Sequence, residues 1–152
     1  MAVCSLSLSS RLIIRYGIKP PLVLGLILAA VGLLLLSRAP ANGDFLCDVL
    51  PGMLLLGFGA GMAFNPVLVA AMSDVDPSES GLASGIVNTS FMMGGALGLA
   101  LISSLASYHR DYLVDTGLAP FEALSGGYGM AFLAASLLTL LGSLVGAMFL
   151  RK

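Results

Sequence analysis

The side chains that could do chemistry in this 152-residue sequence are few and scattered. There is one histidine, His109, and there are two cysteines, Cys4 and Cys47, with no metal-ligand spacing. No nucleophile lies in a pattern with a base, and no glycine-rich stretch has the pattern of a phosphate-binding loop. We therefore expect no enzyme activity, no cofactor and no bound metal.

The remaining candidates are neutral side chains inside apolar segments. Asn65 precedes Pro66, whose missing amide is expected to free a backbone carbonyl and bend a helix. Asn88 lies on a glycine-rich helix face with Met92, and Thr89 follows it directly. We take Asn65, Asn88, Thr89 and Met92 as the candidate lining of a substrate cavity. Alternatively, the two asparagines only satisfy hydrogen bonds of the backbone or of a neighbouring helix.

The composition indicates the solvent in which these residues work. Hydrophobic residues make up 58% of the sequence and charged residues 10%, against about 25% charged residues in ordinary soluble domains. Seven basic and eight acidic residues nearly balance, so no basic surface is available to bind the phosphates of a nucleic acid. Lipid is the expected environment.

Uncharged runs between the charge clusters define the elements. A helix needs about 20 apolar residues to cross the hydrocarbon core, and four runs are long enough for one crossing each. The sequence predicts an all-α membrane protein with four transmembrane helices, at residues 20–37, 49–73 with a bend at Pro66, 77–107 and 123–150.

Residues 1–10 are uncharged but too short to cross a membrane, and we interpret them as the remnant of a preceding helix. A basic loop follows at residues 11–19. Basic residues favour the cytoplasmic side. This loop and the C-terminus together carry five, and the two loops on the other side carry Arg38 and Arg110. The protein is expected in the cell membrane, with the C-terminus and the Arg11–Lys19 loop cytoplasmic.

Small residues at four-residue spacing let membrane helices approach closely. We predict packing roles for Gly57, Gly61, Gly81, Gly85, Gly94, Gly98, Gly142 and Gly146. The third predicted helix has two such faces and is expected inside a bundle. Asp76 and Glu79 are placed to cap its first turn; the alternative is a role in binding a proton or cation.

The stretch Gly81–Ala106 carries a family resemblance. It contains Gly-Leu-Ala-Ser-Gly, then Asn-Thr, then Gly-Gly-Ala-Leu-Gly. This pattern resembles the penultimate helix of the fourteen-helix drug:proton antiporters (EmrB/QacA type) of the major facilitator superfamily. Phe91 and Met92 stand where that family commonly has Arg-Gln. The resemblance implies that the four helices are part of the C-terminal bundle of a major facilitator fold.

A second resemblance lies in the basic loop. Ser10–Lys19 is similar to the cytoplasmic loop motif of the superfamily, with Arg15, Gly17 and Lys19 retained. Ile14 stands where the motif has an acid, so the acid–base pairing of that motif is lost.

The resemblance implies a C-terminal segment of a multidrug efflux transporter that exchanges hydrophobic small molecules for protons. Apart from Glu79 in the first turn of the segment at residues 77–107, the predicted spans contain no Asp, Glu, Lys, Arg or His, and such residues usually mark proton pathways. The chain is therefore expected to need the remaining helices of a longer transporter, or another membrane subunit, besides the lipid bilayer. The alternatives are a non-transporting four-helix membrane protein or gene remnant that acts as an assembly partner, and a small oligomeric four-helix exporter.

Overall fold

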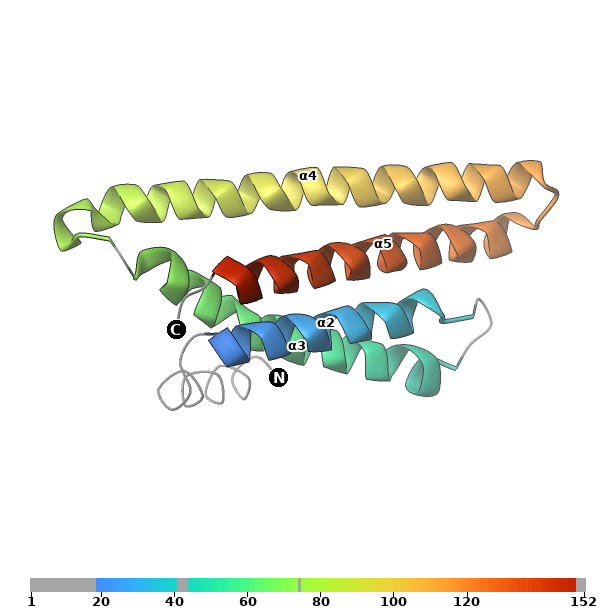
Figure 1. The fold of residues 1–152 in the computed structure, drawn as a ribbon. Coiled ribbons are helices and arrows are strands. Elements are labelled where there is room, and N and C mark those ends of the chain that lie inside the picture. The colour runs from blue at the N-terminus through green and yellow to red at the C-terminus, as the bar shows by residue number, and fades with distance from the viewer. Residues whose placement is uncertain (1–18, 41–43, 74, 150–152) are drawn as a thin grey trace.

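The computed structural model describes residues 19–40, 44–73 and 75–149. All regular structure within these residues is helical (Figure 1). The long helices are α2 (Lys19–Ser37), α3 (Leu50–Met72), α4 (Ser80–Asp115) and α5 (Pro120–Phe149), and short helical turns at Phe45–Val49 and Pro77–Glu79 precede α3 and α4. Within the described residues, four segments are long and apolar enough to span a membrane, in agreement with the four predicted spans.

Two predicted segments lie outside the described residues. These are the remnant at residues 1–10 and the basic loop up to residue 18, which includes Arg15 and Gly17. Lys19, the last residue of the loop motif, is the first residue of α2.

Helix α4 extends beyond the predicted end of its segment, through His109, Arg110 and Asp111 to Asp115. Its 36 residues, at about 1.5 Å each, make a rod of about 54 Å, whereas the hydrocarbon core is about 30 Å thick. Charged side chains near the C-terminal end of α4 can therefore lie outside the lipid core. Charged residues do not interrupt a helix there, so α4 continues through them.

Helix α4 ends two residues before Gly117, whose φ is +91°. The amide of Leu118 donates to the carbonyl of Leu113 over 3.2 Å, and the amide of Gly117 donates to the carbonyl of Val114 over 2.9 Å. This pair of bonds is a Schellman motif, which favours glycine at the left-handed position. It reverses the chain into the antiparallel α5.

Helices α2 and α3 form a tight antiparallel hairpin. Gly25 faces Gly59, and Gly32 faces Gly52. A Cβ atom added to any of these four glycines would lie 3.0 Å or less from a backbone atom of the facing helix. Backbone contact at two levels thus fixes the register of α2 against α3.

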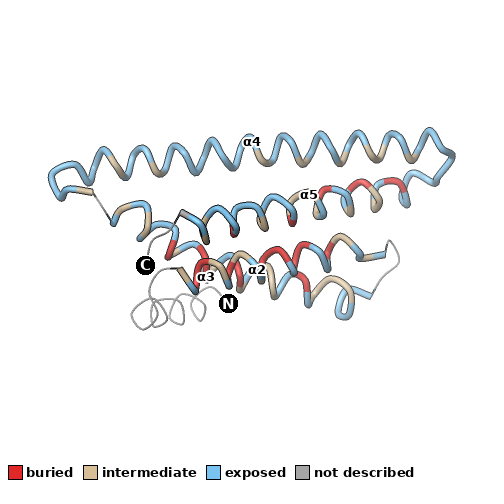
Figure 2. The backbone as a smooth tube through the Cα atoms, in the orientation of Figure 1, coloured by how far each residue is buried: buried red, intermediate tan, exposed pale blue. Residues whose placement is uncertain are grey.

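Helix α5 packs on the other side of α2. The hydroxyl of Ser136, which is fully buried, donates to the carbonyl of Ala30 in α2 over 3.0 Å. Nearer the end of α2, a Cβ atom on Gly129 would lie 2.9 Å from the carbonyl oxygen of Ser37. Figure 2 shows that buried residues are frequent on α2 and occur in parts of α3 and α5.

Helix α4 makes few contacts with the other helices. None of its residues is buried (Figure 2). It meets α5 near the turn, where a Cβ atom on Gly127 would lie 2.7 Å from the carbonyl oxygen of Ala106. It meets α3 at a pair of rings, Phe64 and Phe91, whose centroids are 5.7 Å apart in an edge-to-face arrangement. Most of its surface has no neighbour within the described chain.

Candidate functional site

The four residues predicted to line a substrate cavity lie on two helices. Asn65 is half-buried on α3, beside the fully buried Pro66, and α3 continues as a helix through the proline. Asn88, Thr89 and Met92 are exposed on α4. The prediction that they share a cavity remains a prediction for this chain.

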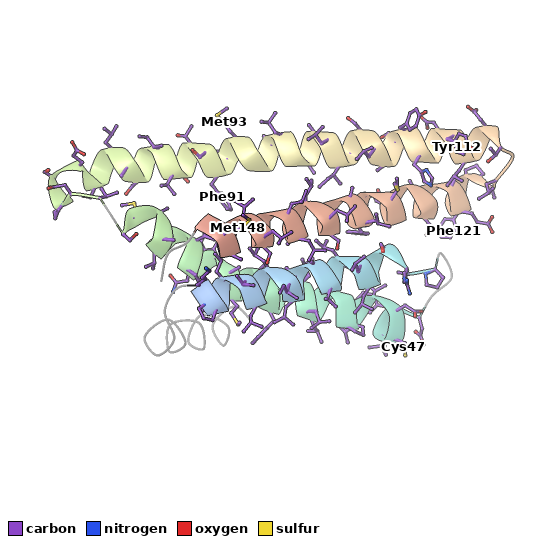
Figure 3. The ribbon with its side chains drawn as sticks, in the orientation of Figure 1. Cys47, Phe91, Met93, Tyr112, Phe121 and Met148 are labelled. Atoms are coloured by element: carbon purple, nitrogen blue, oxygen red, sulfur yellow. The ribbon has the colours of Figure 1, made fainter. Side chains whose placement is uncertain are left out.

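Two aromatic rings provide the link between these two groups. Phe64 precedes Asn65, and Phe91 precedes Met92, so the ring contact brings the two neighbourhoods together. Figure 3 shows Phe91 directed from α4 towards the rest of the bundle, whereas Met93 points away from it. The hydroxyl of Thr89 donates to the carbonyl of Gly85 over 2.8 Å, within its own helix.

The glycines predicted to pack helices divide into two groups. No other described part of the chain lies within 4 Å of a Cβ atom placed on any of six of them, namely Gly57, Gly81, Gly85, Gly94, Gly98 and Gly142. Gly61 and Gly146 are half-buried. The packing role of the six open glycines stays a prediction that requires helices from outside this chain.

The glycines that do pack helices within the chain are others. Gly25, Gly32, Gly52 and Gly59 hold α2 against α3, and Gly127 holds α5 against α4. The signal in the sequence is a spacing of seven residues that occurs on two successive apolar segments, between Gly25 and Gly32 and between Gly52 and Gly59. A four-residue spacing does not detect these two pairs.

The acidic turn before α4 is organised by Asp76. Its carboxylate accepts hydrogen bonds from the hydroxyl of Ser78 over 2.6 Å and from the amide of Ser78 over 2.9 Å. The side-chain bond first, and then the backbone bond, lower the pKa of the Asp76 carboxyl below its usual value. The carboxylate satisfies an amide that the first helical turn leaves without a partner.

Two open clefts flank Tyr128 near the α4–α5 turn, and sequence reasoning identified neither. The first, of about 460 Å³, lies between α2, α4 and α5, and its walls include Leu33, Ile102 and Phe132. Arg110 also lines it. The second, of about 470 Å³, is lined by residues of α5 and by the end of α2 with the segment that follows it. The described residues contain no group of three His, Cys, Asp or Glu side chains that could hold a metal ion.

Comparison with known proteins gives matches along the whole chain. The family described as Major Facilitator Superfamily matches residues 1–152. The puromycin resistance protein of Streptomyces alboniger is 34% identical over 137 residues, which cover 86% of this chain and 27% of that protein. No solved structure matches the chain significantly.

Two further relatives carry names from drug resistance and antibiotic export. The multidrug resistance protein Stp of Mycobacterium tuberculosis is 32% identical over 98 residues, covering 64% of this chain and 18% of that protein. The cephamycin export protein CmcT of Amycolatopsis lactamdurans is 29% identical over 116 residues, covering 76% and 22%. The chain thus spans about a quarter or less of the length of these relatives. With four apolar helices of membrane-spanning length and a family match over its whole length, the chain is a multi-pass membrane protein that belongs to the Major Facilitator Superfamily.

Proposed function

We propose that this chain supplies four C-terminal helices of a drug:proton antiporter that exports hydrophobic small molecules across the cell membrane. The observation that carries the proposal is the open surface of α4. The helix has no buried residue, and no other described part of the chain meets its five glycines Gly81, Gly85, Gly94, Gly95 and Gly98.

Small residues on membrane helices allow close contact between helices. We therefore infer that further helices pack against this open face of α4. The relatives are about four times longer than the matched region, which leaves room for such helices in the same polypeptide. Alternating access requires two helix bundles that move about a central site, and four helices do not provide both.

The distribution of charged residues also supports a need for further helices. The charged residues of the described spans lie at their ends, at Lys19, Asp48, Glu79, Glu122 and the last turns of α4. A proton pathway usually needs an ionisable group in the membrane interior. We infer that the proton-coupling residues lie in the helices outside this chain, and that the basic loop and the C-terminus face the cytoplasm.

Export assays on two gene products test the proposal. The coding DNA upstream of Met1 is sequenced and the continuous reading frame is expressed in bacteria that lack their own efflux pumps. Export of ethidium, a fluorescent hydrophobic cation, is expected from the continuous frame, and no export is expected from the 152 residues alone or from the frame without them.

The same assays separate the alternatives. Robust export by the 152 residues alone would favour a small oligomeric exporter. An independent start at Met1 with no export under any condition would favour a non-transporting membrane protein or a gene remnant that acts as an assembly partner.

A further inference from the structure

The cleft between α2, α4 and α5 has the size of a small-molecule site. Its volume is about 460 Å³, and ligand pockets usually measure about 300–1,000 Å³. It is an open groove whose rims include Leu99 and Leu124, which are 69% and 40% exposed. Because α2, α4 and α5 are all long and apolar enough to span a membrane, we take lipid to be the solvent at the open side of this groove.

Polarity changes along the groove from one end to the other. On α4 the lining starts with Leu99 and Ile102 and ends with Arg110. Leu99 and Arg110 are 11 positions apart, which corresponds to about 17 Å along a helix. Tyr128 lines the polar end from α5 and is 56% exposed, and tyrosine is enriched where hydrocarbon meets the polar headgroups.

Arg110 is the charged residue of the lining, and much of its hydrogen-bonding capacity remains. Its Nε and Nη2 donate to the same carboxylate oxygen of Asp111, over 3.0 and 2.7 Å. A guanidinium has five N–H donors, so these two bonds leave three. The planar guanidinium suits the geometry of a phosphate group.

Gly127 brings the two walls together at the polar end. A Cβ atom there would lie 2.7 Å from the carbonyl oxygen of Ala106 and 3.1 Å from the Cβ of Arg110. The glycine therefore lets α5 approach α4 at the level of Arg110 and places Tyr128 beside the guanidinium-bearing turn.

We propose that this groove binds one phospholipid of the leaflet that faces the α4–α5 turn. An acyl chain lies along the apolar walls, and the headgroup phosphate lies at Arg110 and Tyr128. A water-soluble ligand would find no charged partner at the Leu99 end, whereas an amphiphile matches both ends at once. The inference is independent of drug export.

Photo-crosslinking tests the proposal directly. The full chain is placed in vesicles that contain phosphatidylglycerol with a diazirine on one acyl chain, illuminated, digested and analysed by mass spectrometry. Adducts are expected on the lining residues of Leu99–Arg110 and Leu124–Ala135. Arg110→Gln is expected to reduce their yield at least threefold. Arg38→Gln is the control, since Arg38 is an exposed cation that lines neither cleft, and the yield is expected to stay unchanged.

A second pair of variants tests the groove rather than the charge. Ser103 lines the groove and the adjacent Ser104 does not, and both are exposed on α4. Ser103→Phe is expected to lower the adduct yield, and Ser104→Phe is expected to leave it unchanged, with far-UV circular dichroism checking the helix content of each variant. If Ser103→Phe loses helix content, the Arg110→Gln result decides.

Two probes distinguish a lipid from its parts. A diazirine-labelled diacylglycerol, which lacks the phosphate, is expected to give yields that do not depend on Arg110. Loss of labelling on adding inorganic phosphate alone would show that the site binds the anion rather than the lipid. Equal labelling of the native chain, Arg110→Gln and Ser103→Phe would overturn the proposal.

Discussion

Gly25 and Gly59 face each other across the α2–α3 hairpin so closely that neither position has room for a methyl group. A Cβ atom on Gly59 would lie 2.5 Å from the carbonyl oxygen of Gly25, and one on Gly25 would lie 2.8 Å from the carbonyl oxygen of Gly59. In lipid, where no hydrophobic drive pushes helices together, such backbone proximity is a main source of helix association.

Substitution of this pair is expected to destabilise the hairpin. Gly59→Ala forces a methyl group onto the backbone of α2, and overpacking of this kind costs about 1–3 kcal/mol. Gly57→Ala is the matched control, because the described chain has nothing within 4 Å of a Cβ atom there. Unfolding of both variants by a denaturing detergent, followed by circular dichroism, measures the difference. Equal stability of the two variants would show that α2 and α3 are not in this contact.

The hydrogen bond between Ser136 and the carbonyl of Ala30 is expected to contribute modestly to stability. Bonds of this kind between membrane helices average about 0.6 kcal/mol and reach about 1.7 kcal/mol, so Ser136→Ala is expected to lose an amount in this range. The control is Thr139→Ala, because the Thr139 hydroxyl donates over 2.8 Å to Ala135 in its own helix. Unfolding by a denaturing detergent, followed by circular dichroism, measures the stability of both variants. A larger loss of stability in Thr139→Ala than in Ser136→Ala would contradict the assignment of an interhelical bond.

The turn before α4 is expected to loosen in acid. Because bonds from Ser78 lower the pKa of Asp76, the cap stabilises the turn above the ordinary carboxyl pKa, and this contribution is lost as the pH falls through the lowered value. The protection of the Ser78 amide, which is its exchange rate compared with that of an unstructured peptide at the same pH, should therefore fall in that acidic range. In the Asp76→Asn variant, the protection of the Ser78 amide should no longer follow the titration of a carboxyl group. If the variant and the native chain gave the same pH profile, the capping role of Asp76 would be contradicted.

Glu79 is expected to be dispensable for proton coupling. It is exposed and belongs to the turn that begins α4, outside the interior of the predicted span. In the continuous reading frame, Glu79→Gln should keep proton-driven export within about twofold of the unsubstituted protein at equal expression. Loss of coupling with normal protein levels would instead assign a proton-carrying role to this carboxylate.

The sequence predicted the spans because their signal is local. Apolar runs of sufficient length identify transmembrane helices without knowledge of their neighbours. The extension of α4 was missed because His109, Arg110 and Asp111 were interpreted as a loop, although charged residues are good or acceptable helix formers in water. Gly117 was the overlooked marker of the helix end, since its left-handed φ closes the Schellman motif.

Contacts between helices were harder to predict because they depend on which helices are neighbours. The packing role of Gly25 and Gly59 can be predicted only when it is known that α2 and α3 are neighbours and in which register they pair. The cleft at Arg110 and Tyr128 likewise combines residues of three helices, and no single segment carries its pattern. Asn88 and Met92 are exposed on α4, and neither the sequence nor the described structure assigns them a partner.

The two glycine pairs of the α2–α3 hairpin also limit how this part of the protein can move. Sliding α3 along α2 by one turn would bring side chains against a backbone that has space for hydrogen atoms only, at both the Gly25–Gly59 and the Gly32–Gly52 levels. The hairpin must therefore rotate or translate as a single stiff unit. Within the described chain, contact is sparse between α3 and α4, which meet at the rings of Phe64 and Phe91, so we expect α4 to move more freely relative to this unit than α3 does relative to α2.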